Sequence, residues 1–215
     1  MTKSYLPLIS LIFMANVLLS GCASKLNSSS DISTQVLNPA QRAAQLLKNK
    51  QWHLRGKIAF IEKILNQKDK RESASIAWQV NEKAQTQTLN LTSYLGINVL
   101  QLESKKNQHL IKVDGKEYNG ANLDQLIYSL TGLTLPTKAL TYWLKGLPYS
   151  ANDILKNNPD TQLPMSITSY FNNSLWQIKF GQYKTFNGIK MATKFTIEKN
   201  GLLIKVAVKK WSFEV

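Results

Sequence analysis

The sequence has few of the residues from which most catalytic and metal sites are built. Its 215 residues include one cysteine, Cys22, and two histidines, His53 and His109. A single cysteine excludes a disulfide within the chain and a multi-cysteine metal site, and two histidines leave little for a zinc centre or a histidine-based triad. The acidic residues are scattered singly, and the sequence contains neither a nucleophile elbow nor a phosphate-binding glycine loop. We therefore expect no enzymatic activity, no catalytic residue, no metal and no cofactor.

Acidic residues are also scarce relative to basic ones. There are 13 aspartates and glutamates against 27 lysines and arginines, which gives a formal net charge of +14. Such a surplus indicates a partner with an anionic surface and says little about the fold. The apolar content of 43% and the five tryptophans are typical of a chain that folds around a core, not of a disordered one.

The N-terminus has the pattern of a processing segment. Residues 5–19 form a mostly apolar run that is too short and too interrupted to span a bilayer but suits the core of a signal peptide. The run ends in Leu-Ser-Gly-Cys at residues 19–22, which resembles the lipobox at which bacterial lipoproteins are cut and lipidated on the cysteine. We therefore expect residues 1–21 to be a lipoprotein signal peptide and Cys22 to be lipidated. The alternative is a secretory peptide in which the cysteine is incidental.

The composition then changes from a polar linker to a patterned domain. Residues 22–38 are rich in serine and asparagine and have few large apolar residues, which predicts a flexible tether. Residues 39–215 are long enough for one domain with its own core. This domain should open with a helix, because Asn38 is a plausible N-cap, Pro39 suits the first helical position, and the apolar stripe continues to about Lys50.

Alternating apolar residues predict that most of the domain is β-sheet. On the first predicted strand, Trp52, Leu54, Gly56, Ile58 and Phe60 share one face. The same pattern predicts further strands at residues 74–80, 89–91, 97–103, 109–113, 163–170, 175–180, 190–198 and 202–211. Polar loops are expected at residues 66–72 and 150–160, and tight hairpin turns at Asp114-Gly115 and Asn200-Gly201.

Two segments between the strands change to the helical period. Asn122 can cap a helix that Gly132 closes, and a second helix should run from near Thr137 to Gly146 or Pro148. Together these elements predict a mainly β protein of the α+β class. We expect one antiparallel sheet, strongly curved or barrel-like, with helices against one face.

The tryptophans occur on separate elements, each on the apolar side of its pattern. They either fill an ordinary aromatic core or line a cavity that holds a lipophilic ligand, as in barrels that enclose one. The sequence pattern leaves both readings open. The residues concerned are Trp52, Trp78, Trp143, Trp176 and Trp211.

A series of short motifs runs along the chain in a fixed order. The motifs are WHLRGKI from residue 52, AWQ from 77, LTSYLG from 91, LTG from 130, LP from 135, LTYWLKGLP from 140, WQI from 176 and a final strand with Trp211. No single motif is specific, but their order, together with the lipobox and the length of the chain, resembles the LolB family of outer-membrane lipoproteins.

The resemblance implies an unclosed antiparallel β-barrel with a helical lid over a hydrophobic cavity. In this family the cavity holds the acyl chains of lipoproteins. The residues of this chain that would line it are Trp52, Trp78, Leu89, Leu91, Trp143, Trp176 and Trp211.

The resemblance also implies partners and a location. Members of the family accept acylated lipoproteins from the soluble periplasmic carrier LolA and place them in the inner leaflet of the outer membrane of Gram-negative bacteria. Ala23 stands where an aspartate would favour retention in the inner membrane, so we expect the protein to be anchored through Cys22 to the periplasmic face of the outer membrane. We also expect it to be a monomer. An exported chain does not meet chromosomal nucleic acid, so we expect none as a partner. The alternatives are a structural outer-membrane lipoprotein and a carrier of another lipophilic ligand.

The sharpest expectation for a single residue concerns Leu95. Ser93 to Gly96 is predicted to be a turn, which puts Leu95 at a tip, either folded back onto the sheet or pointing outward. The family's membrane-inserting leucine lies in a Pro-Leu-Gly turn at this point, so the resemblance implies that Leu95 inserts into the membrane. Tyr94 stands in place of the proline, and a tyrosine can itself lie at a membrane–water boundary.

The basic residues offer a way to attract an anionic partner. They either steer an acidic carrier or lipid headgroups to the protein, or form an ordinary solvated surface. The residues considered are Arg55, Lys57, Lys68, Lys70, Lys105 and Lys106.

Overall fold

The computed structural model describes residues 37–133 and 135–214. The predicted signal peptide at 1–21, the lipidation site Cys22 and most of the predicted tether lie outside the described residues. None of the helices in the described part of the chain has both the length and the hydropathy to cross a membrane.

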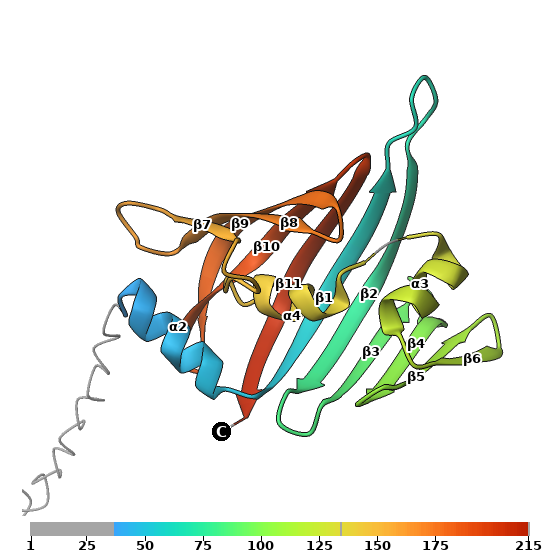
Figure 1. Ribbon diagram of the computed structural model, residues 1–215, viewed down its shortest axis with the longest axis horizontal. Coiled ribbons are helices and arrows are strands. Elements are labelled where there is room, and N and C mark those ends of the chain that lie inside the picture. The colour runs from blue at the N-terminus through green and yellow to red at the C-terminus, as the bar shows by residue number, and fades with distance from the viewer. Residues whose placement is uncertain (1–36, 134, 215) are drawn as a thin grey trace, which may run out of the picture. The chain divides into compact units, whose positions relative to one another are not determined.

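The domain is built on one antiparallel sheet of 11 strands, which curves around the helices (Figure 1). The strand order is β6-β5-β4-β3-β2-β1-β11-β10-β9-β8-β7, so β6 and β7 are the two edges and the sheet is not closed. This confirms the predicted fold class. The strands are β1 (Gln51–Glu62), β2 (Lys70–Asn81), β3 (Thr86–Thr92), β4 (Asn98–Lys105), β5 (Gln108–Val113), β6 (Lys116–Gly120), β7 (Ile154–Asn157), β8 (Pro164–Phe171), β9 (Ser174–Phe186), β10 (Ile189–Lys199) and β11 (Leu202–Glu214).

Three helices of the described residues accompany the sheet, and the predicted caps define two of them. Helix α2 (Pro39–Lys48) begins with a capping box, in which the Asn38 side chain accepts a hydrogen bond from the Gln41 backbone N–H at 2.9 Å. Helix α3 (Leu123–Thr131) is capped by Asn122 and ends at Gly132, which adopts the left-handed conformation. Helix α4 (Thr137–Trp143) starts where expected. It lies over the face of the sheet that carries the apolar residues (Figure 1).

Several boundaries differ from those predicted. The edge strands β6 and β7 were not predicted, and β7 lies inside the polar segment 150–160, because the backbone of an edge strand can pair without an apolar side-chain pattern. Strand β2 also begins earlier than predicted, at Lys70 inside the predicted loop 66–72, because its polar first residues pair with β1 through the backbone, as Lys70 does with Glu62. Helix α4 ends at Trp143 instead of at Gly146 or Pro148, since the chain turns where the Gly146 N–H donates to the Trp143 carbonyl.

The apolar side chains form two clusters on one face of the sheet. The larger cluster lies under α2 and α4 and contains all five tryptophans. The smaller one joins Leu123 and Ile127 of α3 to Leu102 and Ile111 of β4 and β5. The ladder between β1 and β11 shifts register after Arg55, and a Cβ atom on Gly56 would lie 2.2 Å from the Ala207 carbonyl oxygen, so only glycine fits there.

Candidate functional site

The five tryptophans predicted to line a cavity form one tryptophan cluster in the core. Trp52 contacts Trp78 and Trp211, with ring centroids 5.4 Å and 5.6 Å apart. Trp143 of α4 contacts Trp176 of β9 at 5.9 Å, and none of the five rings is more than 6% exposed. Aromatic contacts thus join β1, β2 and β11 to one another and α4 to β9, and both groups of rings belong to the same apolar core.

The indole N–H groups of the cluster are not equally satisfied. Trp78 donates to the Gln87 side chain at 3.1 Å, Trp143 to Asp153 at 2.9 Å and Trp211 to a backbone carbonyl at 3.1 Å. Trp52 and Trp176 have no acceptor among the described residues. A buried donor without an acceptor costs about 1–3 kcal/mol, so these two groups are sites at which an acceptor inside the core would be stabilising.

The other two predicted cavity residues, Leu89 and Leu91, lie at the side of this cluster. Both are partly buried on β3, where Leu89 pairs with Trp78 on one side and Leu102 on the other. Leu89 packs against both apolar clusters. The structure thus brings all seven predicted residues into contact with the same core.

The segment after α4 is fastened to the sheet by a buried ion pair. Lys145 is fully buried, and its Nζ lies 2.5 Å from Oε1 of Glu82 at the end of β2. Burial lowers the pKa of Lys145, and the hydrogen bond and charge of Glu82 oppose this shift. Arg42 of α2, itself buried, donates from Nη2 to the Lys145 carbonyl at 2.9 Å. Lys145 therefore connects both helices to the sheet.

A second set of polar contacts holds the other side of this segment. Asp153 accepts hydrogen bonds from the Trp143 indole, from the Tyr149 backbone N–H at 2.8 Å and from the Ser169 hydroxyl at 2.6 Å. Burial alone would raise the pKa of Asp153, but these hydrogen bonds hold it below its usual value. Sequence reasoning missed Lys145 and Asp153, because a charged residue beside an apolar motif carries no signal of its distant partner.

A groove of about 560 Å³ opens between α4 and the sheet; we call it the α4 groove. Gln87, Ser104 and His109 form its floor and lie opposite one another on β3, β4 and β5, while Thr137 and Tyr142 of α4 line it from above. Gln87 accepts the hydrogen bond of Trp78, so one residue of the groove floor also contacts the tryptophan cluster.

His109 in the α4 groove leads us to predict that the folded domain is less stable in acid. The pKa of His109 is lowered by burial and by the charge of Lys138, against the opposing charge of Asp124. The unfolded histidine therefore takes up a proton first, so the free energy of unfolding should fall as the pH drops below 6.5, the ordinary histidine value. Urea unfolding at about pH 7 and about pH 5.5 should show this loss, and His109→Gln should reduce it. An unchanged pH dependence in the variant would contradict the assignment to His109.

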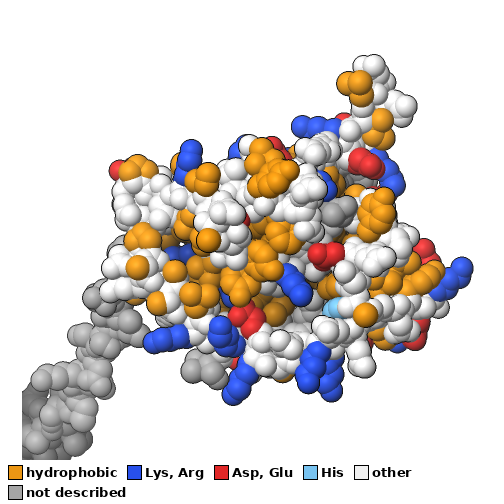
Figure 2. All heavy atoms as spheres, viewed as in Figure 1, with side chains coloured by type: hydrophobic (Ala, Val, Ile, Leu, Met, Phe, Trp, Pro, Cys, Tyr) orange, Lys and Arg blue, Asp and Glu red, His pale blue; other side chains and the backbone are white. Residues whose placement is uncertain are grey.

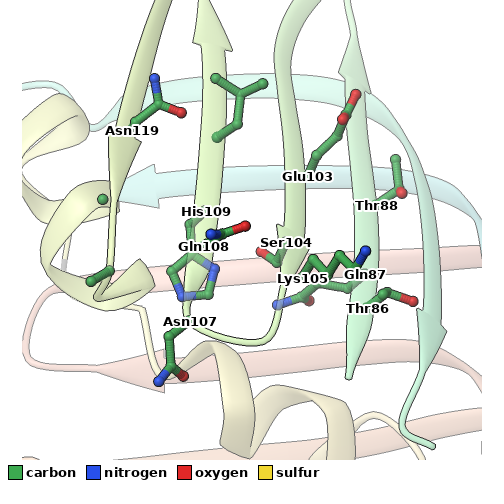
Figure 3. A pocket seen from close by; sticks show the side chains of 13 residues that line it. Thr86, Gln87, Thr88, Glu103, Ser104, Lys105, Asn107, Gln108, His109 and Asn119 are labelled. Carbon is green, nitrogen blue, oxygen red and sulfur yellow. The ribbon is translucent and has the colours of Figure 1, made fainter. Parts of the chain in front are cut away.

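Two further pockets lie on the sheet; one adjoins the α4 groove and shares Gln87, Ser104 and His109 with it. This pocket, of about 650 Å³, lies over β3 to β6 and is lined mainly by hydroxyl, amide and charged side chains, including Thr88, Glu103, Lys105 and Asn119 (Figure 3). This polar lining does not suit a hydrocarbon chain. The tryptophans line neither this pocket, the second one, nor the α4 groove.

The second pocket, also about 650 Å³, is a basic groove on the opposite face of the sheet from the tryptophans. Its lining has no aspartate or glutamate. Of the six basic residues singled out in the sequence, only Arg55 and Lys57 belong to it; Lys68 and Lys70 lie at the β1–β2 hairpin and Lys105 and Lys106 at the β4–β5 turn. The five cationic side chains that line the groove are those of Arg55, Lys57, Lys184, Lys194 and Lys209.

Leu95 points outward from a well-defined turn. The Gly96 N–H donates to the Ser93 carbonyl at 3.0 Å, and the Ser93 N–H donates to the Ile97 carbonyl at 2.8 Å. Leu95 is 79% exposed and Tyr94 is 98% exposed. Of the two orientations that the sequence left open, the structure has the one in which the leucine is presented to the outside.

Comparison with known proteins gives consistent matches. The sequence profile of one family, described as "Outer membrane lipoprotein LolB", matches residues 50–211. The chain is 32% identical over 214 residues to a protein of Psychromonas ingrahamii, covering 99% of this chain and 97% of that one. It is 30% identical over 197 residues to a protein of Aeromonas hydrophila, covering 91% and 92% of the two chains. Both relatives are named outer-membrane lipoprotein LolB.

Two solved structures are also similar. A DUF1329 family protein from Desulfovibrio piger superposes with a TM-score of 0.49 at 10% identity, covering 82% of this chain and 90% of that one. A LolA superfamily protein from Nitrosomonas europaea gives a TM-score of 0.47 at 8% identity, covering 78% and 87%.

Proposed function

The chain belongs to the LolB family of outer-membrane lipoproteins, and from this membership we propose that it receives acylated lipoproteins from the periplasmic carrier LolA and inserts them into the inner leaflet of the outer membrane. Leu95 carries this proposal. An apolar side chain that is 79% exposed at the corner of a hydrogen-bonded turn suits contact with a bilayer. Tyr94 beside it would lie at the membrane–water boundary.

The chemistry of acyl chains requires a direct handover. Exposing one sixteen-carbon chain to water costs on the order of 12 kcal/mol, at about 0.8 kcal/mol per CH₂. Release into the periplasm followed by recapture is therefore too slow to matter, and the chains must pass from one apolar interior to the next. The sequence contains no phosphate-binding loop, so affinity that increases from carrier to this protein to bilayer drives the transfer.

The tryptophan cluster is the proposed place for the acyl chains. Its rings pack together in the core, so cargo enters as they separate, and α4 is the element proposed to move, because its displacement would withdraw Trp143 from Trp176. The two indole N–H groups without an acceptor, on Trp52 and Trp176, support this role. The ester and amide carbonyls that link acyl chains to a lipoprotein are acceptors of the kind that these groups lack.

The anchor and the approach of the carrier complete the proposal. Cys22 carries the acyl chains that hold the protein on the membrane almost irreversibly, residues 22–38 tether it, and residues 39–215 act as one lipoprotein-binding domain in a monomer. The basic groove beside Arg55 and Lys57 attracts an acidic carrier. Its five cations form no ion pair with a described carboxylate, so they remain available to a partner.

A transfer experiment tests this function. Carrier loaded with a radiolabelled lipoprotein is mixed with vesicles that hold this protein and with protein-free vesicles. Label should pass to the protein and then to the bilayer without nucleotide, and the initial rate should fall as salt screens the basic groove. No transfer above the protein-free control would favour a structural lipoprotein. Extraction of another lipid in place of the labelled cargo would favour a carrier of a different ligand.

A further inference from the structure

A second exposed apolar tip lies on the loop of residues 63–69, between β1 and β2. The Gln67 N–H donates to the Ile64 carbonyl at 3.2 Å, and Asn66 has a positive φ of 59°, so residues 64–67 form a turn with Leu65 at its corner. Leu65 is 88% exposed, more than Leu95. In Figure 1 the loop projects beyond the rest of the sheet, and in Figure 2 apolar side chains lie at its end.

The base of this loop is held in place. Glu62 pairs with Lys70 as the last pair of the hairpin, and the Lys63 N–H donates to the Gly201 carbonyl of the neighbouring β10–β11 turn at 2.7 Å. The loop is thus tied to two hairpins at its base, while its tip carries an apolar residue. Leucine is unusual at a turn corner, where polar residues are common, and Ile64 beside it is a second exposed apolar residue.

The sheet topology places this loop at the same end as the Leu95 turn. Strands β1 and β3 are both antiparallel to β2, which lies between them, so both run in the same direction. The loop that follows β1 and the turn that follows β3 therefore emerge from one end of the sheet, two strands apart. The β1–β2 hairpin continues from the last β2–β3 pair, Ser75 with Thr92, to Glu62 with Lys70, so the Leu65 tip projects farther and a bilayer that meets both tips lies oblique to the strands.

The charges around the loop match an anionic surface. Four exposed cations lie on the loop and its base, against three exposed acids, Glu62, Asp69 and Glu72. Basic residues near an apolar tip strengthen contact with acidic headgroups, by about 1 kcal/mol for each lysine or arginine at the surface. The cations are Lys63, Lys68, Lys70 and Arg71.

We propose that the 63–69 loop is a second membrane contact, in which Leu65 enters the interface of an anionic phospholipid bilayer beside Leu95. This inference rests on the proposed function, because that function turns the Leu95 end of the sheet toward the membrane. One contact leaves the domain free to pivot about it. Two contacts on separate hairpins set the tilt of the sheet, and with it the direction in which the interior faces the bilayer.

Depth measurements with a spin label test this contact without reference to transfer. The full chain with Leu65→Cys is labelled in vesicles that contain phosphatidylglycerol, and collisions with oxygen and with a water-soluble nickel complex are compared. The label at position 65 should be exposed to oxygen and shielded from nickel. Met165→Cys is the matched control, because Met165 is 47% exposed at the start of β8, at the other end of the sheet, and should stay accessible to nickel. The unsubstituted chain, treated with the same spin label, measures the signal from any label attached to Cys22.

A charged substitution at position 65 tests the same contact through the rate of lipoprotein delivery. In the transfer experiment, Leu65→Glu should accept lipoprotein normally and deliver it to vesicles roughly tenfold more slowly, since burial of one leucine is worth at least that factor. Met165→Glu should deliver at the normal rate.

The outcomes separate the two proposals. A label at position 65 that nickel reaches freely in vesicles, while lipoprotein transfer proceeds, overturns the loop contact and leaves the function standing. Shielding of that label only after the carrier is added also overturns it, since the loop would then bind protein. A label buried in the bilayer of a protein that transfers no lipoprotein supports the contact and overturns the proposed function.

Discussion

Replacing Leu95 with glutamate should leave acceptance of lipoprotein intact and abolish its delivery to vesicles. The leucine is 79% exposed and makes no core contact, so the substitution should change the free energy of unfolding by no more than about 0.5 kcal/mol. At a membrane surface the effect is large. The variant loses the roughly 1.5–3 kcal/mol of membrane-binding free energy that burial of the leucine supplies. It must in addition bring a carboxylate into a region that solvates it poorly.

The experiment follows the label in two stages. Carrier and protein are first incubated alone to measure acceptance, and vesicles are then added to measure delivery. Leu95→Glu should accumulate cargo in the first stage and retain it in the second. Leu95→Met, which keeps an apolar side chain at the tip, should deliver as the unsubstituted chain does. Delivery by Leu95→Glu at the unsubstituted rate would remove the main support for membrane insertion at this turn.

Replacing Trp143 with alanine should destabilise the folded domain by about 3–5 kcal/mol, the range for truncation of a buried tryptophan. Trp143 is fully buried, contacts Trp176 and Phe171, and donates to Asp153. The variant loses these contacts together, and Asp153 loses one of the donors that keep its pKa low. Trp143→Phe keeps most of the ring packing but not the N–H donor, so it should lower the free energy of unfolding by less than Trp143→Ala does.

Urea unfolding of the three proteins measures these differences. Because the ring of Trp143 holds α4 against the core, the alanine variant should also bind an apolar fluorescent probe more strongly and retain lipoprotein less well than the phenylalanine variant. A loss of stability below about 1 kcal/mol in Trp143→Ala would mean that the α4 ring is not part of the core packing.

Local signals in the sequence were sufficient for the fold class and for most elements. The caps at Asn38 and Asn122 predicted the starts of α2 and α3, because each side chain satisfies a free N–H of its own helix within three residues. The Asp114-Gly115 turn was likewise predicted, and both residues have positive φ. Alternation predicted the buried strands but not β6 and β7, since an edge strand is defined by the neighbour with which it pairs.

The candidate site was predictable in its residue types and not in its arrangement. The motifs indicated Leu95 and its turn, because a turn needs only adjacent residues, and they indicated which tryptophans face the core. They gave no sign of Leu65, whose significance depends on β1 and β3 ending on the same side of β2. The basic residues were visible in the sequence, but only folding separates Arg55 and Lys57 from Lys105 and Lys106.

Sequence alone was therefore enough for whatever depends on neighbours along the chain: helix ends, tight turns, the inward face of each strand and the lipobox motif. Tertiary structure decided which tryptophan rings meet, which cations converge and how α4 is fastened. Lys145 meets Glu82 across 63 positions, and Trp143 meets Trp176 across the sheet. Such contacts arise when a curved sheet closes over its apolar face, and their energy depends on burial and geometry that no local pattern contains.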